Sequence, residues 1–398
     1  MPDRHRPKGP AFEVLAVFLK LGIASFGGPV AHLGYFRGEF VQRRKWLDEE
    51  TYADLVALCQ FLPGPASSQV GFSIGLMRAG YPGGLAAWTG FTLPSAILMV
   101  LFAFGAGALD GPLGTGVLHG LKLVAVAIVA QAVWGMARSL CPDRGRAAIA
   151  AAAAMLILFS TAPLTQIGTI LLGGLAGWIA CREDRNSAPG KVLIPVLRGV
   201  GFIALGLYFL LLVLLPLLHE VPGIALFDAF YRSGALVFGG GHVVLPLLRE
   251  AFVAPGWIDD DAFLAGYGAA QAVPGPLFTF SAYLGTVAGP PPNGIAGALI
   301  GLIGIFLPGL LALIGVLPFW ESLRIGGWAQ AAMRGVNAAV VGLLAAALYD
   351  PVWTGSVKAP ADCAVALAGF VLLTVWKTPP LIVVVLSAAA GGALSFAS

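Results

Sequence analysis

Long apolar stretches, each near the length needed to cross a bilayer, dominate the pattern of this chain. A bilayer core of about 30 Å takes about 20 residues of helix. The stretches are continuous and do not alternate between apolar and polar positions, which disfavours a β-barrel. The pattern predicts an all-α polytopic membrane protein in a lipid bilayer. The clearest stretches run from Leu85 to Leu109, from Leu121 to Met136, from Ile203 to Leu218 and from Ile295 to Leu317.

The composition supports the same class of protein. The 398 residues are 58% hydrophobic and 11% charged, whereas soluble proteins carry about 25% charged residues. The four cysteines are scattered, with no CxxC pair and no histidine cluster beside them. No metal site, disulfide framework or cofactor is therefore indicated, and nothing points to nucleic acid as a partner. The basic N-terminus leads into a first segment that we interpret as uncleaved.

Two Pro-Gly-Pro motifs interrupt the apolar sequence, at Pro63–Pro65 and at Pro274–Pro276. Each follows a glutamine, and a Phe-Gly-Gly run precedes each one, at Phe26–Gly28 and Phe238–Gly240. Proline removes a helical hydrogen bond and clashes with the preceding turn. In a membrane, such breaks survive only beside protein or a water-filled cavity. We therefore expect broken, re-entrant helices that line a polar site, as in secondary transporters; a simple packing kink is the alternative.

The two halves of the chain repeat one another beyond these motifs. Trp46-Leu47-Asp48 matches Trp257-Ile258-Asp259, and Pro94 matches Pro308. The matches predict three units, which are an N-terminal repeat at 11–183, a linker with an extra transmembrane helix at 184–223, and a C-terminal repeat at 224–398.

Charge placement then predicts how the repeats are oriented. Cytoplasmic loops are enriched in Lys and Arg. Before Trp46 the chain reads Arg43-Arg44-Lys45, but before Trp257 it reads Ala254-Pro255-Gly256. We expect two inverted-topology repeats and about 13 transmembrane segments, with a cytoplasmic N-terminus and a periplasmic C-terminus; a parallel duplication is the alternative. The helical segments expected before the linker are 11–27, 30–44, 48–62, 66–79, 83–107, 113–138, 146–161 and 164–181.

The broken segments carry the chemistry of an anion site. Pro65 and Pro276 suit the first position of a new half-helix. Its first amides are then free, and the positive end of its dipole points at the break. Two such half-helices, joined by hydroxyls and glycine runs, would hold one oxyanion. The candidate substrate-binding residues in these segments are Gly27, Gly28, Gly64, Ser67, Ser68, Gln69, Gly239, Gly240, Gly275, Thr279 and Ser281.

Ionisable residues inside apolar segments are further candidates, because each is costly in lipid. Lys122 and Arg334 are cations that would help to bring a dianion into the protein, so we include them among the substrate-binding candidates. Six residues near the breaks are candidates for gating or coupling. Their carboxylates would pair with the arginines or carry a proton in coupled transport, and purely structural ion pairing is the alternative. These six are Arg37, Glu39, Arg249, Glu250, Gln60 and Gln271.

At these motifs the chain closely resembles the chromate ion transporter family in its long, two-domain form. The resemblance rests on Ser25–Pro29, Gly34–Arg37, Trp46–Asp48 and Cys59–Gln69, and in the second half on Val237–His242 and Gly268–Pro276. It implies a multi-pass protein of the bacterial inner membrane that exports chromate and confers chromate resistance. Its partners would be chromate or a similar oxyanion and the lipid bilayer, with proton coupling and a homodimer left open.

Three other functions compete with chromate export. A carrier for sulfate, a tetrahedral dianion of the same shape, is the nearest rival. A passive channel would also use re-entrant helices. A membrane-embedded enzyme acting on lipid is disfavoured, because no metal-ligand cluster and no catalytic pair of carboxylates lies within a span.

Overall fold

The computed structural model describes residues 9–106, 111–160, 164–181, 196–218, 220–238, 241–320 and 327–396. Within these ranges all regular secondary structure is helical, as the sequence predicts. In the first half the helices are α1 (Ala11–Ala24), α2 (Gly28–Phe36), the π-helical η1 (Arg37–Arg43), α3 (Glu49–Phe61), α4 (Ala66–Ala106), α5 (Gly111–Leu140), α6 (Arg144–Phe159) and α7 (Leu164–Ala180).

Helix α8 (Arg198–Leu214) and the short η2 (Leu215–Leu218) connect the halves. The second half then comprises α9 (Pro222–Ala235), η3 (Gly241–Val243), α10 (Val244–Phe252), α11 (Asp260–Ala270), η4 (Leu277–Thr279), α12 (Phe280–Val287), α13 (Gly294–Val316), η5 (Leu317–Phe319), α15 (Gly327–Ala347), η6 (Leu348–Trp353), α16 (Thr354–Ser356), α17 (Pro360–Thr374) and α18 (Pro380–Leu394).

The element α4 contains the two segments that the sequence predicts, the half-helix 66–79 and the span 83–107. The backbone is non-helical at Ala79 and at Gly80, where φ is +66°. These two residues interrupt the helix, so α4 consists of two helices that match the predicted half-helix and the predicted span. In the second half the corresponding bend is a full loop, at 288–293 between α12 and α13.

Corresponding local structures recur in the two halves. Asp48 caps α3 by accepting a 2.7 Å hydrogen bond from the Thr51 amide, and Asp259 caps α11 by accepting one of 2.8 Å from Ala262. Such caps satisfy amides that a helix start leaves unpaired.

The aromatic core repeats in the same way. The rings of Phe18 and Phe40 stack at 5.0 Å, and those of Phe230 and Phe252 lie 4.5 Å apart. All four side chains are fully buried. Contacts between rings of this kind add to the stabilisation from burial alone. Corresponding phenylalanine pairs therefore join α1 to η1 in the first half and α9 to α10 in the second.

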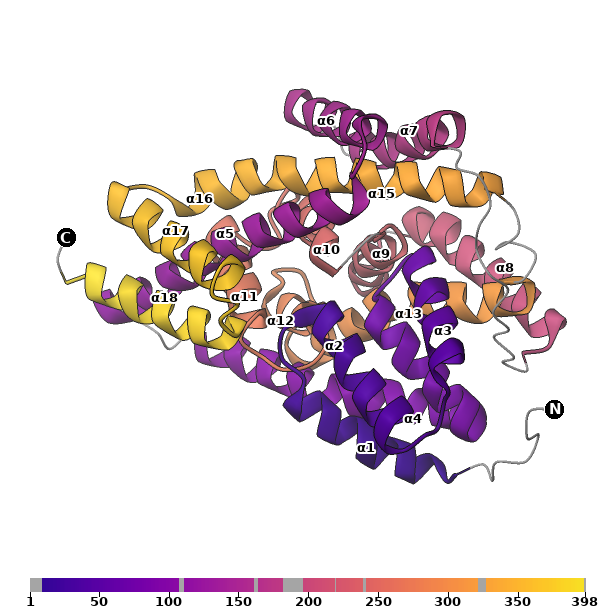
Figure 1. Ribbon diagram of the computed structural model, residues 1–398. Coiled ribbons are helices and arrows are strands. Elements are labelled where there is room, and N and C mark those ends of the chain that lie inside the picture. Colours follow the sequence, from indigo (N-terminus) through magenta and orange to yellow (C-terminus); the bar gives the residue numbers. More distant parts are fainter. Residues whose placement is uncertain are drawn as a thin grey trace.

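The halves are interleaved at their last helices. The pair α6 and α7 packs against α15, and the pair α17 and α18 packs against α5, which Figure 1 shows at the top and the left of the molecule. Glycines allow the helix backbones to approach. A Cβ atom added at Gly335 would lie 2.1 Å from the Gly173 carbonyl oxygen, and one at Gly120 would lie 2.2 Å from that of Ser387. The last two helices of each half therefore pack against a long helix of the other half, α15 or α5.

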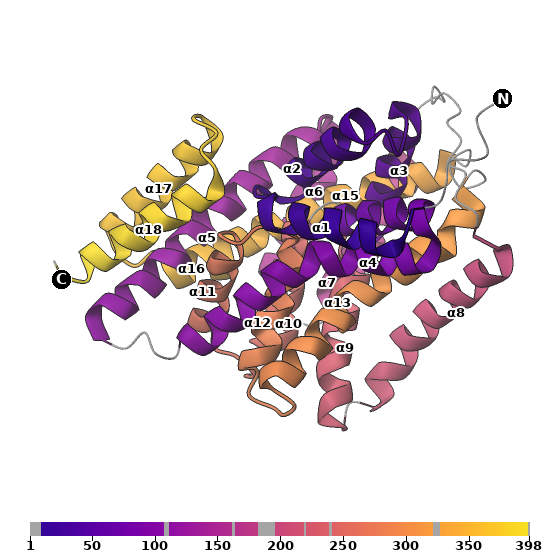
Figure 2. The same cartoon turned by 90° about the horizontal axis from the view of Figure 1, so that it is seen from below.

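Five helical segments in the described residues are long and apolar enough to cross a membrane, and four shorter helices are apolar as well. Large apolar side chains cover the outside of α8, which lies along the edge of the molecule in Figure 2. Exposed side chains of this kind suit lipid contact. The fold is that of a polytopic membrane protein, while the count of 13 crossings and the inverted orientation stay predictions.

Candidate functional site

The first break lies between α1 and α2, where glycine permits a left-handed backbone. Gly27 has φ of +102° and Gly28 has φ of +77°, and Pro29 lies in the first turn of α2. Residues other than glycine rarely adopt such values. Gly27 is exposed and Gly28 is half-buried, so the start of α2 is reachable by water.

The two Pro-Gly-Pro loops adopt similar conformations. Gly64 has φ of +108° and Gly275 has φ of +89°. Helix α4 begins directly after Pro65, and the short η4 that leads into α12 begins directly after Pro276. New helices begin at these prolines, but each proline precedes the first helical residue and does not occupy the predicted first position.

Each Pro-Gly-Pro loop is hydrogen-bonded to the Phe-Gly-Gly segment of the other half. The Gly64 amide donates to the Val237 carbonyl at 2.8 Å, and the Gly275 amide donates to the Ser25 carbonyl at 2.8 Å. Val237 and Ser25 each precede a Phe-Gly-Gly run. The breaks are thus assembled across the two halves. The Gly64 and Gly275 amides, however, are engaged in these bonds and are not free for a ligand.

Each loop also contacts a proline-containing helix of the other half. A Cβ atom at Gly64 would lie 2.8 Å from the Cα of Gly309, beside Pro308 in α13. A Cβ atom at Gly275 would lie 2.7 Å from the Ser95 hydroxyl, beside Pro94 in α4. Only glycine fits at either position.

Three of the predicted polar ligands near the breaks have protein partners. Gln69 donates to the carbonyls of Pro63 and Gly309 at 2.8 Å each, so its amide nitrogen braces the loop. Thr279 donates to the Pro276 carbonyl at 2.8 Å. Ser67 lies 3.4 Å from the His32 ring.

Three other hydroxyls are buried without such partners. Within the described residues, the hydroxyls of Ser25, Ser68 and Ser281 have no hydrogen-bond partner and are at most 2% exposed. They come from the break before α2, the start of α4 and the start of α12. A buried hydroxyl without a partner costs about 1–3 kcal/mol, so these groups are suited to an acceptor that arrives from outside.

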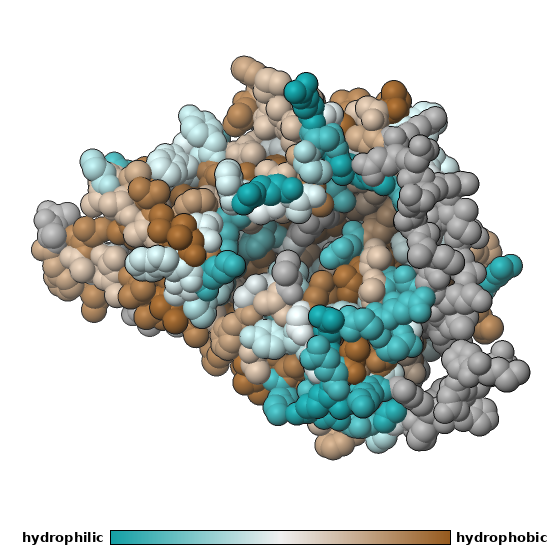
Figure 3. Space-filling model, viewed as in Figure 1, coloured by the Kyte–Doolittle hydropathy of each residue, from teal (hydrophilic) through white to brown (hydrophobic). Residues whose placement is uncertain are grey.

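The glycine run of the second half is only partly visible. Gly239 and Gly240 lie outside the described residues. Gly241, which follows them, is buried, and a Cβ atom there would lie 3.4 Å from Pro29 and 3.8 Å from Leu277 and Phe278. The start of η3 therefore contacts the starts of α2 and η4. Figure 3 shows this face hollowed near its middle, where Figure 1 places α2, α9, α10 and α12.

Comparison with known proteins identifies the family. The model of the Chromate transporter family matches residues 12–178 and again residues 224–392. The chain belongs to the chromate transporter family.

Relatives in this family are similar over nearly their whole length. A chromate transport protein of Pseudomonas aeruginosa is 28% identical over 96% of this chain and 92% of its own. A probable chromate transport protein of Synechococcus elongatus is 28% identical over 95% and 94%. A chromate transport protein of Cupriavidus metallidurans is 26% identical over 84% and 81%. No solved structure matches the chain.

In this member of the chromate transporter family, the arginines predicted for gating form ion pairs. Arg37 bonds Glu49 at 2.6 Å, and Arg249 forms a two-pronged pair with Asp260 at 2.9 and 3.0 Å. Both pairs occupy corresponding positions in the two halves. The pairing of Arg37 with Glu39, one alternative from the sequence, is wrong, because Glu39 bonds Arg43 and Arg44 at 2.6 Å.

The remaining gating candidates are in different surroundings. Glu250 lines a cavity of about 530 Å³ together with Asp228, Arg232 and Trp257. Gln60 is exposed and Gln271 is half-buried. Within the part of the chain that the structure describes, no hydrogen bond or ion pair joins Glu250, Gln60 and Gln271 to one another.

Lys122 and Arg334 are engaged with protein groups that do not belong to the breaks. The Lys122 ammonium pairs at 2.8 Å with Asp261, in the first turn of α11, whereas the Pro-Gly-Pro break follows the last turn of that helix. Eleven helical residues span about 16 Å. Arg334 donates to the Cys181 carbonyl, just past the end of α7, at 2.9 Å. Their role as direct ligands stays a prediction.

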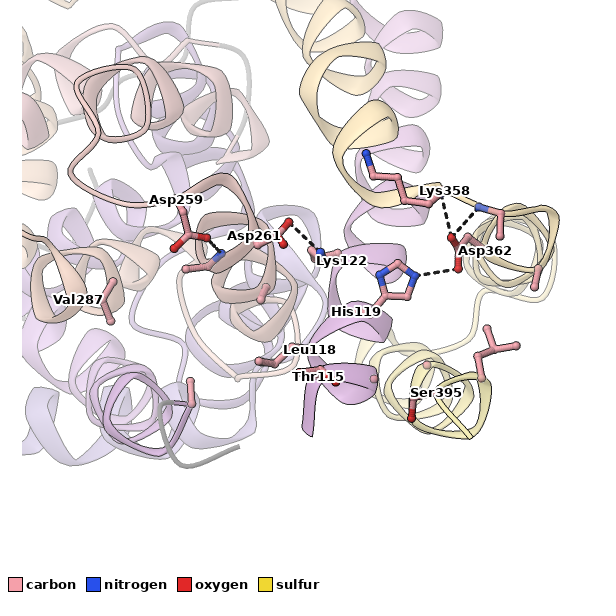
Figure 4. A pocket seen from close by; sticks show the side chains of 18 of the residues that line it. Thr115, Leu118, His119, Lys122, Asp259, Asp261, Val287, Lys358, Asp362 and Ser395 are labelled. Carbon is pink, nitrogen blue, oxygen red and sulfur yellow. Dashed lines mark hydrogen bonds and ion pairs between the residues drawn. The ribbon is translucent and has the colours of Figure 1, made fainter. Parts of the chain in front are cut away.

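The sequence did not predict a pair of residues, His119 and Asp362, that lies near Lys122. Lys122 and His119 both line a cavity of about 950 Å³, and His119 pairs with Asp362 at 2.8 Å (Figure 4). Asp362 lies 243 residues away along the chain, so no local pattern could reveal the pair. The one signal in the sequence is a repeat match, in which His119-Gly120-Leu121-Lys122 corresponds to Arg334-Gly335-Val336-Asn337.

Proposed function

We propose that this chain is a secondary transporter that exports chromate across the bacterial inner membrane by alternating access and thereby confers chromate resistance. Membership of the chromate transporter family supports the substrate. The observation that carries the mechanism is the set of buried hydroxyls without protein partners, on Ser25, Ser68 and Ser281, at three helix breaks. Chromate oxygens would supply the missing acceptors.

Helix ends add to the attraction for a dianion. The starts of α2 and α4, and of η3 and η4 with α10 and α12 behind them, all lie at the breaks. A helix start carries a partial positive charge and unpaired amides. In α4 the backbone amide of Gln69 already donates to the Pro65 carbonyl. The backbone amides of Ser67 and Ser68 are left for the anion. In this scheme Lys122 and Arg334 attract the anion before it reaches the helix breaks.

Alternating access would follow from two inverted repeats, at 11–183 and 224–398, with the linker helix in 184–223 reversing the second. Reciprocal hydrogen bonds between the two halves support this arrangement. The Gly64 amide donates to the Val237 carbonyl, and the Gly275 amide donates to the Ser25 carbonyl. Inverted repeats that share a central site can rock about it and open it to either side. The proposed topology has about 13 crossings and a cytoplasmic N-terminus.

Transport by the purified protein in proteoliposomes tests the proposal. We expect saturable chromate uptake that Ser68→Leu abolishes, because leucine fills the space and removes the donor. Ser139→Leu is the matched control, since Ser139 is an exposed serine whose hydroxyl bonds its own helix. Sulfate flux without chromate flux would identify the protein as a sulfate carrier. Flux that never saturates would indicate a channel. Normal transport by Ser68→Leu would refute the proposed binding site at the helix breaks.

A further inference from the structure

The cavity of about 950 Å³ is separate from the helix breaks and lies between the two halves. Helices α4 and α5 of the first half line it, and so do α11, α12, α17 and α18 of the second half. Two ion pairs cross it from α5, His119 to Asp362 and Lys122 to Asp261, each at 2.8 Å (Figure 4). Because 73% of the Asp261 side chain is exposed, water reaches this cavity.

Asp362 is fixed as a carboxylate. Its Oδ2 atom accepts hydrogen bonds from the amides of Lys358 at 2.9 Å and Ala359 at 3.0 Å, at the start of α17. Its Oδ1 atom faces the Nε2 atom of His119. Amide donors and a helix start favour the charged form of a carboxylate. The group in this pair that can change its charge is therefore the imidazole.

The other half has no titratable group at the equivalent position. Arg334 corresponds to His119, and its guanidinium, which keeps its proton in proteins, bonds the Cys181 carbonyl at 2.9 Å. Asn337 corresponds to Lys122. One repeat thus has a permanent charge where the other has a switchable one.

We propose that His119, held by Asp362, is the proton-binding site that couples a proton gradient to oxyanion transport; this inference rests on the proposed function. The Nε2 hydrogen stays on the Asp362 side in both states, and Nδ1 takes a proton from water in the cavity and returns it to water. With the proton bound, an ion pair joins α5 to α17. Without it only a neutral donor remains, so α5 moves more easily against α17 and α18.

Other polar groups of the cavity surround this pair on every side. Lys122 lies one turn along α5, and Lys358 precedes α17. Asp259 and Asp261 come from the start of α11, and Tyr283 comes from α12. Two lysines and two aspartates therefore line the same cavity as the His119 ring. A coupling site needs a group that both gains and loses its proton.

Two assays on the full-length protein in proteoliposomes test the inference. The first measures exchange of labelled chromate for unlabelled chromate at equal pH, and the second measures chromate accumulation against an imposed pH gradient. We expect His119→Asn to keep exchange and lose gradient-driven accumulation. His119→Arg, which installs the residue of the other repeat, should do the same. Thr115→Val, which changes the same cavity wall without changing charge, should match the wild type in both assays.

The outcomes separate this inference from the proposed function. No chromate exchange by the wild type would overturn the proposed function. Exchange by the wild type without any response to the pH gradient would overturn only the coupling role. Wild-type accumulation by His119→Asn would also overturn it. If His119→Asn loses exchange as well, the His119→Arg variant decides, because its permanent ion pair with Asp362 keeps the contact between α5 and α17. Exchange without accumulation in His119→Arg supports the proposal. Accumulation in His119→Arg, or the absence of exchange, contradicts it.

Discussion

Gly64 and Gly275 hold the two Pro-Gly-Pro loops in place through their conformation and their lack of a side chain. Both have positive φ, and both amides donate to a carbonyl of the other half at 2.8 Å. Any Cβ atom would collide with α13 or α4. These two residues thus serve to assemble the breaks, while the hydroxyls of Ser25, Ser68 and Ser281 remain to meet the substrate.

We expect Gly64→Ala to destabilise the protein and to reduce transport. A non-glycine residue in the left-handed region costs about 1–2 kcal/mol, and overpacking against Gly309 adds about 1–3 kcal/mol. Thermal unfolding of the purified protein in detergent measures the effect. Gly38→Ala is the control, because a Cβ atom at Gly38 has nothing within 4 Å and its φ is not positive. Equal midpoints for both variants would contradict this role of Gly64.

At the residue scale, the sequence could predict the breaks but not how their polar groups are used. Glycine and proline act locally, so Pro65 and Gly64 reveal a break wherever they stand. Partners such as Val237 for Gly64 and Gly309 for Gln69 depend on how distant segments pack. For this reason the Gly64 amide and the Gln69 side chain, both from residues predicted to bind substrate, have protein partners in the structure.

At the scale of elements, small residues decide how closely the two halves approach. Gly116 and Gly120 on α5 face Gly391 and Ser387 on α18, and Gly335 on α15 faces Gly173 and Gly177 on α7. Small residues four positions apart let helix backbones pack closely in membranes. The same kind of contact therefore recurs at both ends of the molecule.

We expect Gly120→Ala to weaken the packing of α5 on α18. Its methyl group would lie 2.2 Å from the Ser387 carbonyl oxygen and 2.7 Å from the Cα of Ala388, which costs about 1–3 kcal/mol when helices must shift. Gly135→Ala on the same helix is the matched control, because no atom lies within 4 Å of the added Cβ. Unfolding midpoints compare the two, and a Gly120→Ala midpoint at or above that of Gly135→Ala would contradict the packing.

The sequence predicts the helices better than it predicts their partners. Apolar length and proline positions reveal segments such as 48–62, observed as α3 from Glu49 to Phe61. The predicted break between 66–79 and 83–107 is present as well, because the backbone is non-helical at Ala79 and Gly80. The packing of α5 against α17 and α18 leaves no local trace, since both helices come from the other half of the chain.

At the scale of the whole molecule, the account requires the two repeats to have opposite orientations. The contacts of the breaks exchange between halves, and the positive charge before Trp46 has no counterpart before Trp257. Positive loops stay in the cytoplasm. The two corresponding tryptophan loops should therefore lie on opposite sides of the membrane.

Labelling of introduced cysteines in intact cells and inverted vesicles measures this orientation. After replacement of the four native cysteines, we expect a cysteine at Lys45 to react with an impermeant reagent only in inverted vesicles. A cysteine at Ala254 should react only in intact cells. Reaction of both positions from the same side would indicate a parallel duplication and would rule out the inverted arrangement.

The location of bound chromate tests the central claim most directly. Anomalous X-ray scattering from chromium identifies the ion without assumptions about the surrounding protein, in crystals of the full-length protein grown with chromate. The account predicts a chromium peak at the helix breaks, with chromate oxygens within hydrogen-bond reach of the Ser68 hydroxyl and of groups at the start of α12. A single occupied site elsewhere, for example in the cavity beside Lys122, would contradict it.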